Sequence, residues 1–455
     1  MGTAEAPARE RAGPEDGFTG LTAQPGSALR KLIIVVFLLN VVSAALFIHY
    51  VDRPVYDDQF NIFDVHTYAK EGLSVSSIRA NKNPPGPAGF AWMAATVRLI
   101  GGNELRDARI GALLSWIFLV CGALVAARYS WFPELWHGGL LASLIFPHSA
   151  ESAALVLTEG PALLFAVLGA MAWIEFASRS KPTRKTVALG IGGALSMGIA
   201  VACRQYFLAL VPAALLLAAS QSKGRNFKDE RRWYVAMFIS LVAAALPALL
   251  LALIWKGLSS PGMAGGTSYA NWTARIGFDA GRPLIAAFYT AVYLLPLTIP
   301  AVFRAERKSR WRMIFIGLCA GVLTALLGNK LLQPGPLQTA VHFLARGAVG
   351  RSLALGAIAA VSIYAAAMTC TALWQHRTIF AEQPPLMFSI LTVGFFIAEQ
   401  FGVGGNIPFY DRYMLQMAPF LGIIAFATFP RVTGARLAVF AAMAAIGQVM
   451  LWRFA

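Results

Sequence analysis

Two adjacent carboxylates, Asp57 and Asp58, follow the first long apolar run of the sequence, in the stretch PVYDDQFNIFDVH. Adjacent side chains point in different directions on a helix or in an extended loop, so one carboxylate can act on a substrate while the other binds or orients it. A carboxylate at the mouth of an apolar cavity is desolvated, which raises its pKa and improves it as a general base toward a hydroxyl group. The alternative is a solvated loop carboxylate beside Arg53, and Asp64 is expected to lie at the surface.

A third carboxylate, Glu159, follows Thr158 in the stretch VLTEGPALLF, at the start of another apolar run. A carboxylate at this place could face the same compartment as Asp57. The alternative is a helix start, with Thr158 as the N-cap and Glu159 in the first turn, where the helix dipole favours a negative charge. The two interpretations are compatible.

Two arginines stand at the ends of apolar runs. Arg204, with Gln205, lies between two such runs, where a guanidinium can offer several hydrogen-bond donors to a phosphate. Arg412 begins another run, in the stretch NIPFYDRYMLQMAP. The alternative for both is an arginine that extends its charged end to water, and Asp411 could simply neutralise Arg412. His148 has no metal-ligand neighbours and is expected to be structural.

The composition places these residues in a membrane protein. Of the 455 residues, 57% are hydrophobic and 13% are charged, and the mean hydropathy is +0.61. These values are typical of an all-α, polytopic transmembrane helix bundle and exclude an ordinary water-soluble domain. The formal net charge is +16, but the 38 Lys and Arg residues are distributed among short loops between apolar runs. This distribution indicates topology signals and argues against a nucleic-acid partner.

Thirteen apolar stretches predict membrane spans, at 31–51, 109–128, 135–149, 157–177, 184–203, 205–220, 234–257, 283–303, 312–332, 352–374, 385–402, 411–429 and 435–453. Residues 1–30 are predicted to form a disordered cytoplasmic tail, and 31–455 one transmembrane domain with an outer loop at about 52–108. Within this loop the stretch 85–101 is expected to form a helix at the membrane surface.

The loop also contains the rigid turn of Pro85 and Gly86, which we expect to fix how it folds back onto the membrane. With a cytoplasmic N-terminus, the positive-inside rule places the basic clusters at 179–185, 223–232 and 304–312 in the cytoplasm. The acidic pair, Glu159 and the two arginines then share the opposite side, periplasmic or lumenal. A site that faces outward is the hypothesis, because ionisable groups at membrane depth usually have partners or a function.

The order of these motifs resembles that of the GT-C superfamily, the polyprenyl-phosphate-sugar-dependent membrane glycosyltransferases. Within it, the pattern is most similar to the dolichyl-phosphate-glucose-dependent α-1,2-glucosyltransferases. Asp58 and Tyr206-Phe207 depart from the family pattern, which has Asp-Glu at the acidic pair and an Asn-containing continuation after Arg-Gln. The matching pieces, denser in the first half of the chain, are Pro54-x-x-Asp57-Asp58, Pro85-Gly86, Phe146-Pro147 to Thr158-Glu159, Arg204-Gln205 and Asp411-Arg412-Tyr413.

The resemblance implies a hexosyltransferase of the bacterial inner membrane or the endoplasmic reticulum membrane, with its active site periplasmic or lumenal. Its implied partners are a dolichyl or undecaprenyl phosphate sugar donor, a glycan or lipid-linked acceptor and membrane lipid, and neither a metal nor another cofactor is implied. Transfer would occur with inversion. The residue roles that follow are catalysis by Asp57 and Asp58, donor-phosphate binding by Arg204, Gln205 and Arg412, and substrate binding by Thr158, Glu159, Pro85 and Gly86.

Two alternatives stay open on the sequence. A transporter or flippase of a lipid-linked or anionic substrate would use Glu159 and Arg204 to line a translocation path, and should carry charges midway along several spans. A non-catalytic scaffold subunit would tolerate loss of Asp57. The position of most charges at span ends favours the enzyme.

Overall fold

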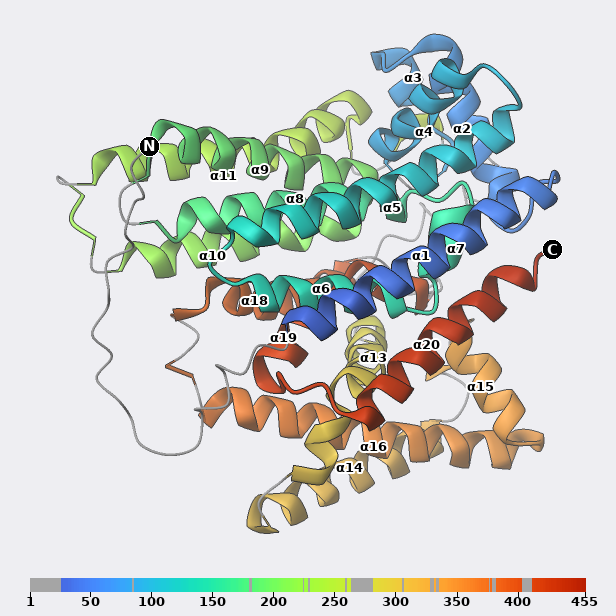
Figure 1. The fold of residues 1–455 in the computed structure, drawn as a ribbon, viewed down its shortest axis with the longest axis vertical. Coiled ribbons are helices and arrows are strands. Elements are labelled where there is room, and N and C mark those ends of the chain that lie inside the picture. The colour runs from blue at the N-terminus through green and yellow to red at the C-terminus, as the bar shows by residue number, and fades with distance from the viewer. Residues whose placement is uncertain are drawn as a thin grey trace.

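The computed structural model describes residues 26–83, 86–179, 182–223, 225–227, 230–257, 260–262, 281–304, 307–327, 331–332, 335–375, 377–378, 382–402 and 411–455. Helices form nearly all of this part of the chain and build one bundle (Figure 1), as the sequence predicts. The predictions for residues 1–25 lie outside the described residues, and the first helix begins at Gly26, inside the predicted tail.

Eleven helices of the described chain are long and apolar enough to cross a membrane. In chain order they are α1 (Gly26–Tyr50), α5 (Glu104–Tyr129), α8 (Glu159–Ala177), α9 (Arg184–Cys203), the run formed by η2 (Gln205–Ala209) with α10 (Leu210–Ser222), α11 (Arg231–Trp255), α13 (Gly281–Arg304), α14 (Arg307–Leu327), α16 (Gly347–Gln375), α18 (Pro384–Glu399) and α20 (Gly434–Trp452). An α-helix pairs most of its backbone polar groups within itself, which is what allows such a segment to cross a bilayer.

Two of the thirteen predicted spans are wrong as full-length helices. In the stretch 135–149, α6 (Pro133–Ile145) ends just before Phe146 and Pro147, and Ser149 begins a separate short helix, α7 (Ser149–Ala154). The stretch 411–429 contains the 3-10 helix η6 (Asp411–Gln416) and the short helix α19 (Ala418–Thr428), with Pro419 in its first turn. Proline lacks a backbone donor and disfavours the helical conformation of the residue before it, so each apolar run holds only part of a span.

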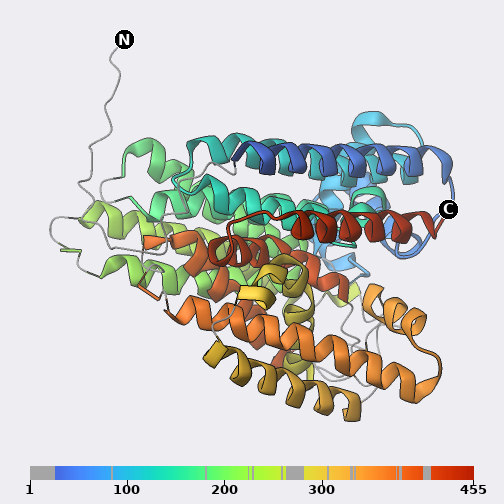
Figure 2. The same cartoon turned by 60° about the horizontal axis from the view of Figure 1, so that its bottom comes forward.

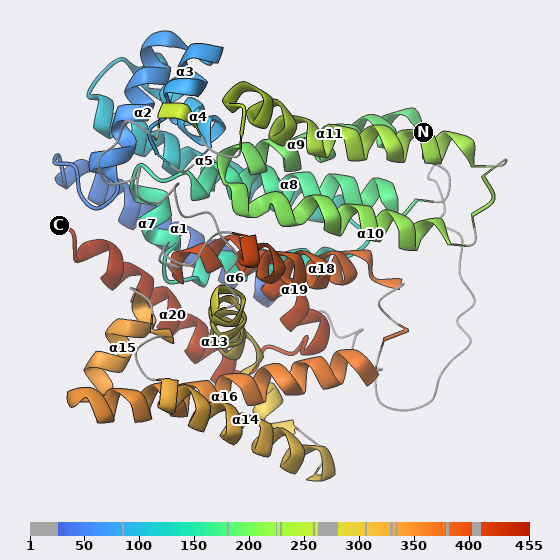
Figure 3. The ribbon, with the colours of Figure 1, turned by 180° about the vertical axis from the view of Figure 1, so that it is seen from behind.

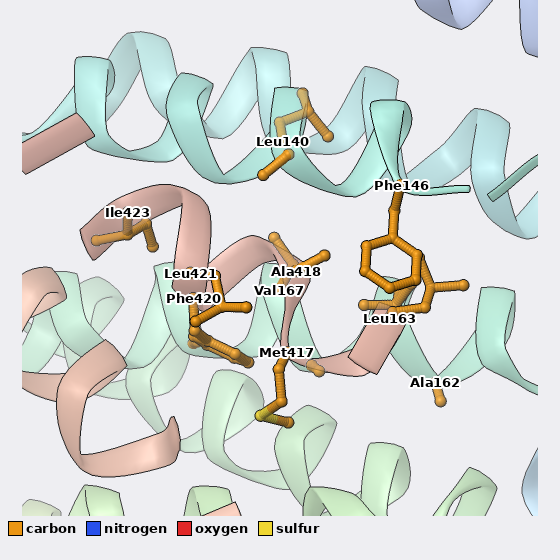
Figure 4. Close-up of a cluster of buried hydrophobic side chains, with 14 of the residues drawn as sticks. Leu140, Phe146, Ala162, Leu163, Val167, Met417, Ala418, Phe420, Leu421 and Ile423 are labelled. Atoms are coloured by element: carbon orange, nitrogen blue, oxygen red, sulfur yellow. The ribbon is translucent and has the colours of Figure 1, made fainter. Parts of the chain in front are cut away.

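The two short helices lie against each other in the middle of the bundle. A Cβ atom added to Gly422 would stand 2.5 Å from the carbonyl oxygen of Gly138, so the backbones approach as closely as only glycine permits. Side chains from α6, α8 and α19 meet around this contact (Figure 4), among them Leu140, Leu163 and Phe420. The interrupted helices are therefore enclosed by protein, which is where non-helical backbone at membrane depth is tolerated.

The bundle is unevenly buried. In α8, 78% of the apolar window is buried by other parts of the protein, against 17% in α14. Figures 1 and 2 show α14 and α16 side by side at one edge, away from α8. At this edge Gly321 and Gly356 bring the two backbones together, since a Cβ on either would lie 2.7 Å from the other's carbonyl oxygen. Helix α8 is thus the central element, and its first residue is Glu159.

Short helices gather at one end of the bundle. They are α2 (Asp58–Glu71), α3 (Val75–Ala80), α4 (Pro87–Ile100), α7 (Ser149–Ala154) and α15 (Pro336–Leu344), and the C-terminal end of α20 lies there too (Figures 1 and 3). Helix α4 occupies most of the stretch predicted to lie at the surface and is not among the candidate spans of the described chain. The predicted outer loop is therefore a small helical assembly on one end of the membrane domain.

Candidate active site

Asp57 stands at the N-terminal boundary of α2, but its side chain does not cap that helix. It turns instead to Arg412 of η6, whose Nη2 atom lies 2.5 Å from Asp57 Oδ2. The Asp57 side chain is 28% exposed and that of Arg412 only 10%. Tyr56 has a left-handed backbone (φ 52°) and places its ring 5.2 Å below the guanidinium of Arg412. Asp57 is thus a carboxylate open to solvent on one side and held by a buried cation on the other.

Glu159 joins this pair to a second arginine. Arg204 donates through Nη2 to Glu159 Oε1, and Arg412 Nε lies 3.8 Å from the same oxygen. Glu159 is 1% exposed, and its other oxygen has no hydrogen-bond partner among the described residues. The order Asp57, Arg412, Glu159, Arg204 is a chain of alternating charges, named the ion-pair chain below. Its residues come from the boundary before α2, from η6 and α8, and from the boundary after α9.

The local backbone explains how Arg204 reaches this place. Helix α9 ends at Cys203, Arg204 is extended (φ −147°, ψ 116°), and the 3-10 helix η2 follows. The break turns the Arg204 side chain into the bundle, where it is 5% exposed. Gln205, one residue on, is exposed. The predicted Arg-Gln pair is therefore split, with only Arg204 in the ion-pair chain.

Asp58 has different partners from Asp57. It is fully buried, and Arg109 of α5 donates to Asp58 Oδ2 from Nη2 at 2.5 Å and from Nε at 3.1 Å. Its other oxygen accepts from the amide of Val156 at 2.6 Å. Arg109 also donates to the carbonyl groups of Val51 and Arg53, which hold the preceding loop. These contacts tie the start of α2 to α5 and to the segment before α8, an anchoring arrangement.

Asp64 is also buried, so the expectation of a surface position is wrong. It is 1% exposed and accepts from the amides of Lys82 and Asn83 and from the side chain of Asn83. Burial raises the pKa of Asp64, and these hydrogen bonds oppose that rise. The carboxylate folds the segment between α3 and α4 back onto α2. The backbone amides of Lys82 and Asn83 need a hydrogen-bond acceptor. The sequence around this turn does not show that Asp64 provides it.

The turn before α4 rests against the end of α9. Pro85 lies outside the described residues, and Gly86 donates its amide to the carbonyl of Cys203 at 2.9 Å. A Cβ on Gly86 would stand 1.8 Å from the carbonyl oxygen of Ala202, so only glycine fits there. Gly86 therefore docks the outer helices beside Arg204.

Thr158 occupies the N-cap position of α8 as expected, but its hydroxyl makes no capping hydrogen bond. Its side chain is fully buried, and a Cβ on Gly89 of α4 would come within 2.7 Å of it. The alternative in which the Thr158 side chain caps the helix is wrong in that hydrogen bond, whereas Glu159 does lie in the first turn of α8. Thr158 instead marks the contact between α8 and α4.

A second polar cluster lies beside the ion-pair chain. His148 Nδ1 is 2.7 Å from Glu151 Oε2, and His148 Nε2 is 2.9 Å from Asp411 Oδ1. Tyr293 of α13 donates to Asp411 Oδ2 at 3.2 Å, and Arg453 donates to Glu151 Oε1 at 3.3 Å. We call these five residues the histidine cluster. The interpretation that Asp411 neutralises Arg412 is wrong, because its carboxylate faces His148 and Tyr293.

Sequence reasoning missed Glu151, Tyr293 and Arg453, and assigned His148 only a structural role. A signal existed in the stretch PHSAES, where His and Glu stand three residues apart beside a proline break. Burial lowers the pKa of His148, but Asp411 and Glu151 outweigh it and raise the pKa to about 9. The imidazole is thus a cation at neutral pH.

We expect the advantage in thermal stability of the wild type over His148→Gln to be largest below about pH 6.5 and to be lost as the pH rises through about 9. The folded protein binds the imidazole proton more tightly than the unfolded chain does. This difference in proton affinity contributes on the order of 3 kcal/mol to the free energy of unfolding. The contribution is complete below the pKa of His148 in the unfolded chain, and it is lost above the pKa of His148 in the folded protein. The measurement is the melting temperature in detergent across this range.

The control for this series is His66→Gln, whose imidazole lies at the surface beside Glu104. The expectation is contradicted if the gap between wild type and His148→Gln stays constant with pH.

The fold and the site define an integral membrane protein with a chain of buried ion pairs at one end of a multi-span helix bundle. Among the described residues, no group of three or more His, Cys, Asp or Glu side chains is arranged to hold a metal ion. Neither a protein-family model nor a curated protein matches the chain.

The chain is distantly similar to several solved structures, among them two of one protein and one of another. ArnT from Cupriavidus metallidurans in the apo state has 15% identity and a TM-score of 0.36, over 93% of this chain and 78% of that one. The same protein bound to undecaprenyl phosphate has 14% identity and a TM-score of 0.37 over the same shares. The archaeal oligosaccharyltransferase AglB from Archaeoglobus fulgidus, in complex with an inhibitory peptide and a dolichol-phosphate, has 12% identity and a TM-score of 0.32, over 85% of this chain and 57% of that one. At these TM-scores the similarity by itself identifies no reaction.

Proposed function

We propose that this protein is a membrane glycosyltransferase that moves a sugar from a polyprenyl phosphate, dolichyl or undecaprenyl, to an acceptor hydroxyl group. The observation that carries the proposal is the ion-pair chain. In it the partly exposed carboxylate of Asp57 contacts Arg412, and Glu159 connects Arg412 to a second buried cation, Arg204. The motif order of the sequence supports the donor class.

In the proposed reaction Asp57 takes the proton of the acceptor hydroxyl, and the oxygen attacks the anomeric carbon. The bond between that carbon and the phosphate oxygen breaks, and the electron pair leaves with the polyprenyl phosphate. Attack opposite the leaving group inverts the anomeric centre.

The phosphate that leaves carries the developing charge, and Arg204 and Arg412 are its proposed binding groups. Both are nearly buried, and in a water-poor site a fixed cation stabilises an anion more strongly than in water. Glu159 keeps the two guanidinium groups together before the donor arrives. We assign Gly86 and Thr158 to the wall of the substrate site, because they join α4 to α9 and α8 next to Arg204.

Asp58 and Gln205 have weaker support. Both oxygens of Asp58 are occupied by Arg109 and the amide of Val156, so a role as base would first require these contacts to break. Gln205 is exposed, so it would contact only a part of the polyprenyl phosphate donor that lies outside the helix bundle. Asp57 is therefore the proposed base.

The distribution of basic residues supports the proposed sidedness. The basic segments that surround the α8–α9 and α10–α11 connections lie at the end of the bundle opposite the outer helices (Figure 1). By the positive-inside rule, that end is cytoplasmic and the ion-pair chain is periplasmic or lumenal. The transporter alternative predicts charges midway along several spans. In the described spans the buried charged side chains lie within the first two turns or at the end, which favours the enzyme.

The test is binding and transfer with defined donors. Purified protein in lipid nanodiscs is titrated with undecaprenyl phosphate and with dolichyl phosphate alone, and membranes that contain the protein receive a panel of radiolabelled polyprenyl phosphate sugars. We expect Arg204→Gln to weaken polyprenyl phosphate binding by about 10- to 100-fold, the worth of one charge-assisted hydrogen bond. The matched control is Arg179→Gln, an arginine paired with Glu175 at the other end of α8. A wild type that neither binds either polyprenyl phosphate nor transfers any sugar of the panel overturns the proposal.

A further inference from the structure

The histidine cluster touches the ion-pair chain at one point of the backbone, the peptide bond between Asp411 and Arg412. The Asp411 carboxylate faces His148 and Tyr293, whereas the Arg412 guanidinium faces Asp57 and Glu159. Two adjacent residues of η6 thus anchor to two different sets of helices. Whatever fixes Asp411 also fixes the origin of the Arg412 side chain.

We propose that His148 is a positioning residue, whose imidazole between Glu151 and Asp411 holds η6 so that Arg412 reaches Asp57 and Glu159. The proposal rests on the function proposed above only for the role of Arg412 in binding the donor phosphate, and the position of Arg412 does not depend on that function.

The first support is the geometry of the imidazole. Both ring nitrogens face carboxylate oxygens, at 2.7 Å and 2.9 Å, and His148 is 4% exposed. A neutral imidazole has one N–H donor and could satisfy only one of two ionised carboxylates, whereas the doubly protonated ring donates to both. Because the imidazole is buried and contacts a carboxylate on each side, its orientation is fixed. His148 is therefore a rigid link between Glu151 and Asp411.

The second support is the set of elements that close around the link. Phe146 packs between the rings of His148 and Tyr293, with ring centroids 6.1 Å and 4.5 Å away. Asp411 is approached from a further side by Gly335, where a Cβ would lie 2.0 Å from the carboxylate oxygens. Arg453, at the end of α20, holds the far side of Glu151. The segment after α6, α13 and the start of α15 thus meet around the buried carboxylate of Asp411, and α20 joins the cluster through Glu151.

The third support is the weakness of η6 itself. A 3-10 helix has poorer hydrogen-bond geometry than an α-helix, so contacts from outside decide its orientation. Asp411 is the first residue of η6, and the ion pair with His148 is made at that end. The facing ionisable groups balance when His148 is charged: the carboxylates of Glu151 and Asp411 against the imidazolium and Arg453, with the Tyr293 hydroxyl as a neutral donor.

The test separates positioning from mere stabilisation by measuring where Arg412 lies. Asp57→Cys and Arg412→Cys are combined in a chain whose own cysteines, Cys121, Cys203, Cys319 and Cys370, are replaced by Ala. A short bis-methanethiosulfonate reagent then links the two new thiols, and the yield per folded molecule is measured. We expect His148→Gln to lower this yield strongly, and Tyr293→Phe, which removes one neutral hydrogen bond, to lower it less. This cross-linking measurement needs neither the sugar donor nor the sugar acceptor.

The matched control is His137→Gln. His137 is also a buried histidine, in α6, and its Nδ1 atom has no hydrogen-bond partner among the described residues. Its replacement removes a buried imidazole without touching Asp411. An equal yield in His148→Gln and wild type, or an equal fall in His137→Gln, overturns the proposal.

A double-mutant cycle on sugar transfer gives the second arm. If His148 acts through Arg412, His148→Gln lowers transfer about 10-fold in the wild type but only about 2-fold when Arg412 is already Lys, because coupled residues are not additive. Equal losses in both backgrounds overturn the proposal. If the wild type transfers no sugar and binds no polyprenyl phosphate while the cross-linking difference remains, the proposed function fails and the positioning role stands.

Discussion

Replacement of Asp57 by Asn is expected to lower the rate of sugar transfer by about 10² to 10⁴-fold, the usual contribution of a positioned general base. The amide has nearly the same shape, so it keeps the start of α2 in place, but it accepts no proton and carries no charge for Arg412. Arg412 keeps Glu159 as a partner 3.8 Å away and Asp57 is 28% exposed, so loss of the pair should lower the free energy of unfolding by less than the cost of about 3 to 5 kcal/mol expected for breaking a fully buried pair. The measurement is transfer per folded molecule with the best donor of the panel.

Asp52→Asn is the control for this experiment, since it removes an exposed carboxylate from the same loop. It should transfer at the wild-type rate. Wild-type transfer by Asp57→Asn would exclude Asp57 as the base and bring the scaffold or transporter interpretation forward.

Asp58→Asn is expected to act on folding more than on chemistry. The substitution leaves the Arg109 guanidinium, 1% exposed, beside a neutral side chain, and an uncompensated buried charge costs about 3 to 5 kcal/mol. Because Asp58 also holds the amide of Val156, the outer helices α2 to α4 should detach first. The measurement is thermal unfolding in detergent, together with limited proteolysis of 52–108.

A surface pair is the natural control for the Asp58 experiment. Glu104→Gln breaks the exposed contact with His66 and should cost about 0 to 1 kcal/mol. If Asp58→Asn melts like the wild type and yet loses transfer as completely as Asp57→Asn, Asp58 takes part in the reaction and the anchoring role proposed for it is wrong.

The helical spans were predictable because a bilayer admits few structures. A long apolar run in a bilayer must satisfy its own backbone hydrogen bonds, so it forms a helix, and finding the run in the sequence predicts that helix. The predictions for α6 and α19 failed where Pro147 and Pro419 interrupt runs of adequate length. Hydropathy reports how apolar a run is, and proline changes that value little while it interrupts the helix, after α6 at Pro147 and at the start of α19 at Pro419.

The members of the ion-pair chain were also visible in the sequence, since ionisable groups beside apolar runs are costly and few. Asp57, Glu159, Arg204 and Arg412 all come together, from positions up to 355 residues apart, the difference between 412 and 57. Their pairing was not visible. Asp411 is adjacent to Arg412 in sequence and a natural partner for it, yet the 3-10 geometry of η6 turns the two side chains apart.

The sequence by itself thus determined that the protein is a helical membrane bundle and which few charged residues stand at the ends of its spans, because both follow from local composition. Only the tertiary structure decided which carboxylate serves which cation. Residues 57 and 58 have the same charge and nearly the same place in the chain, but the boundary of α2 turns one toward Arg412 and the other toward Arg109. That choice depends on where η6 and α5 pack, and no stretch of sequence around Asp57 contains it.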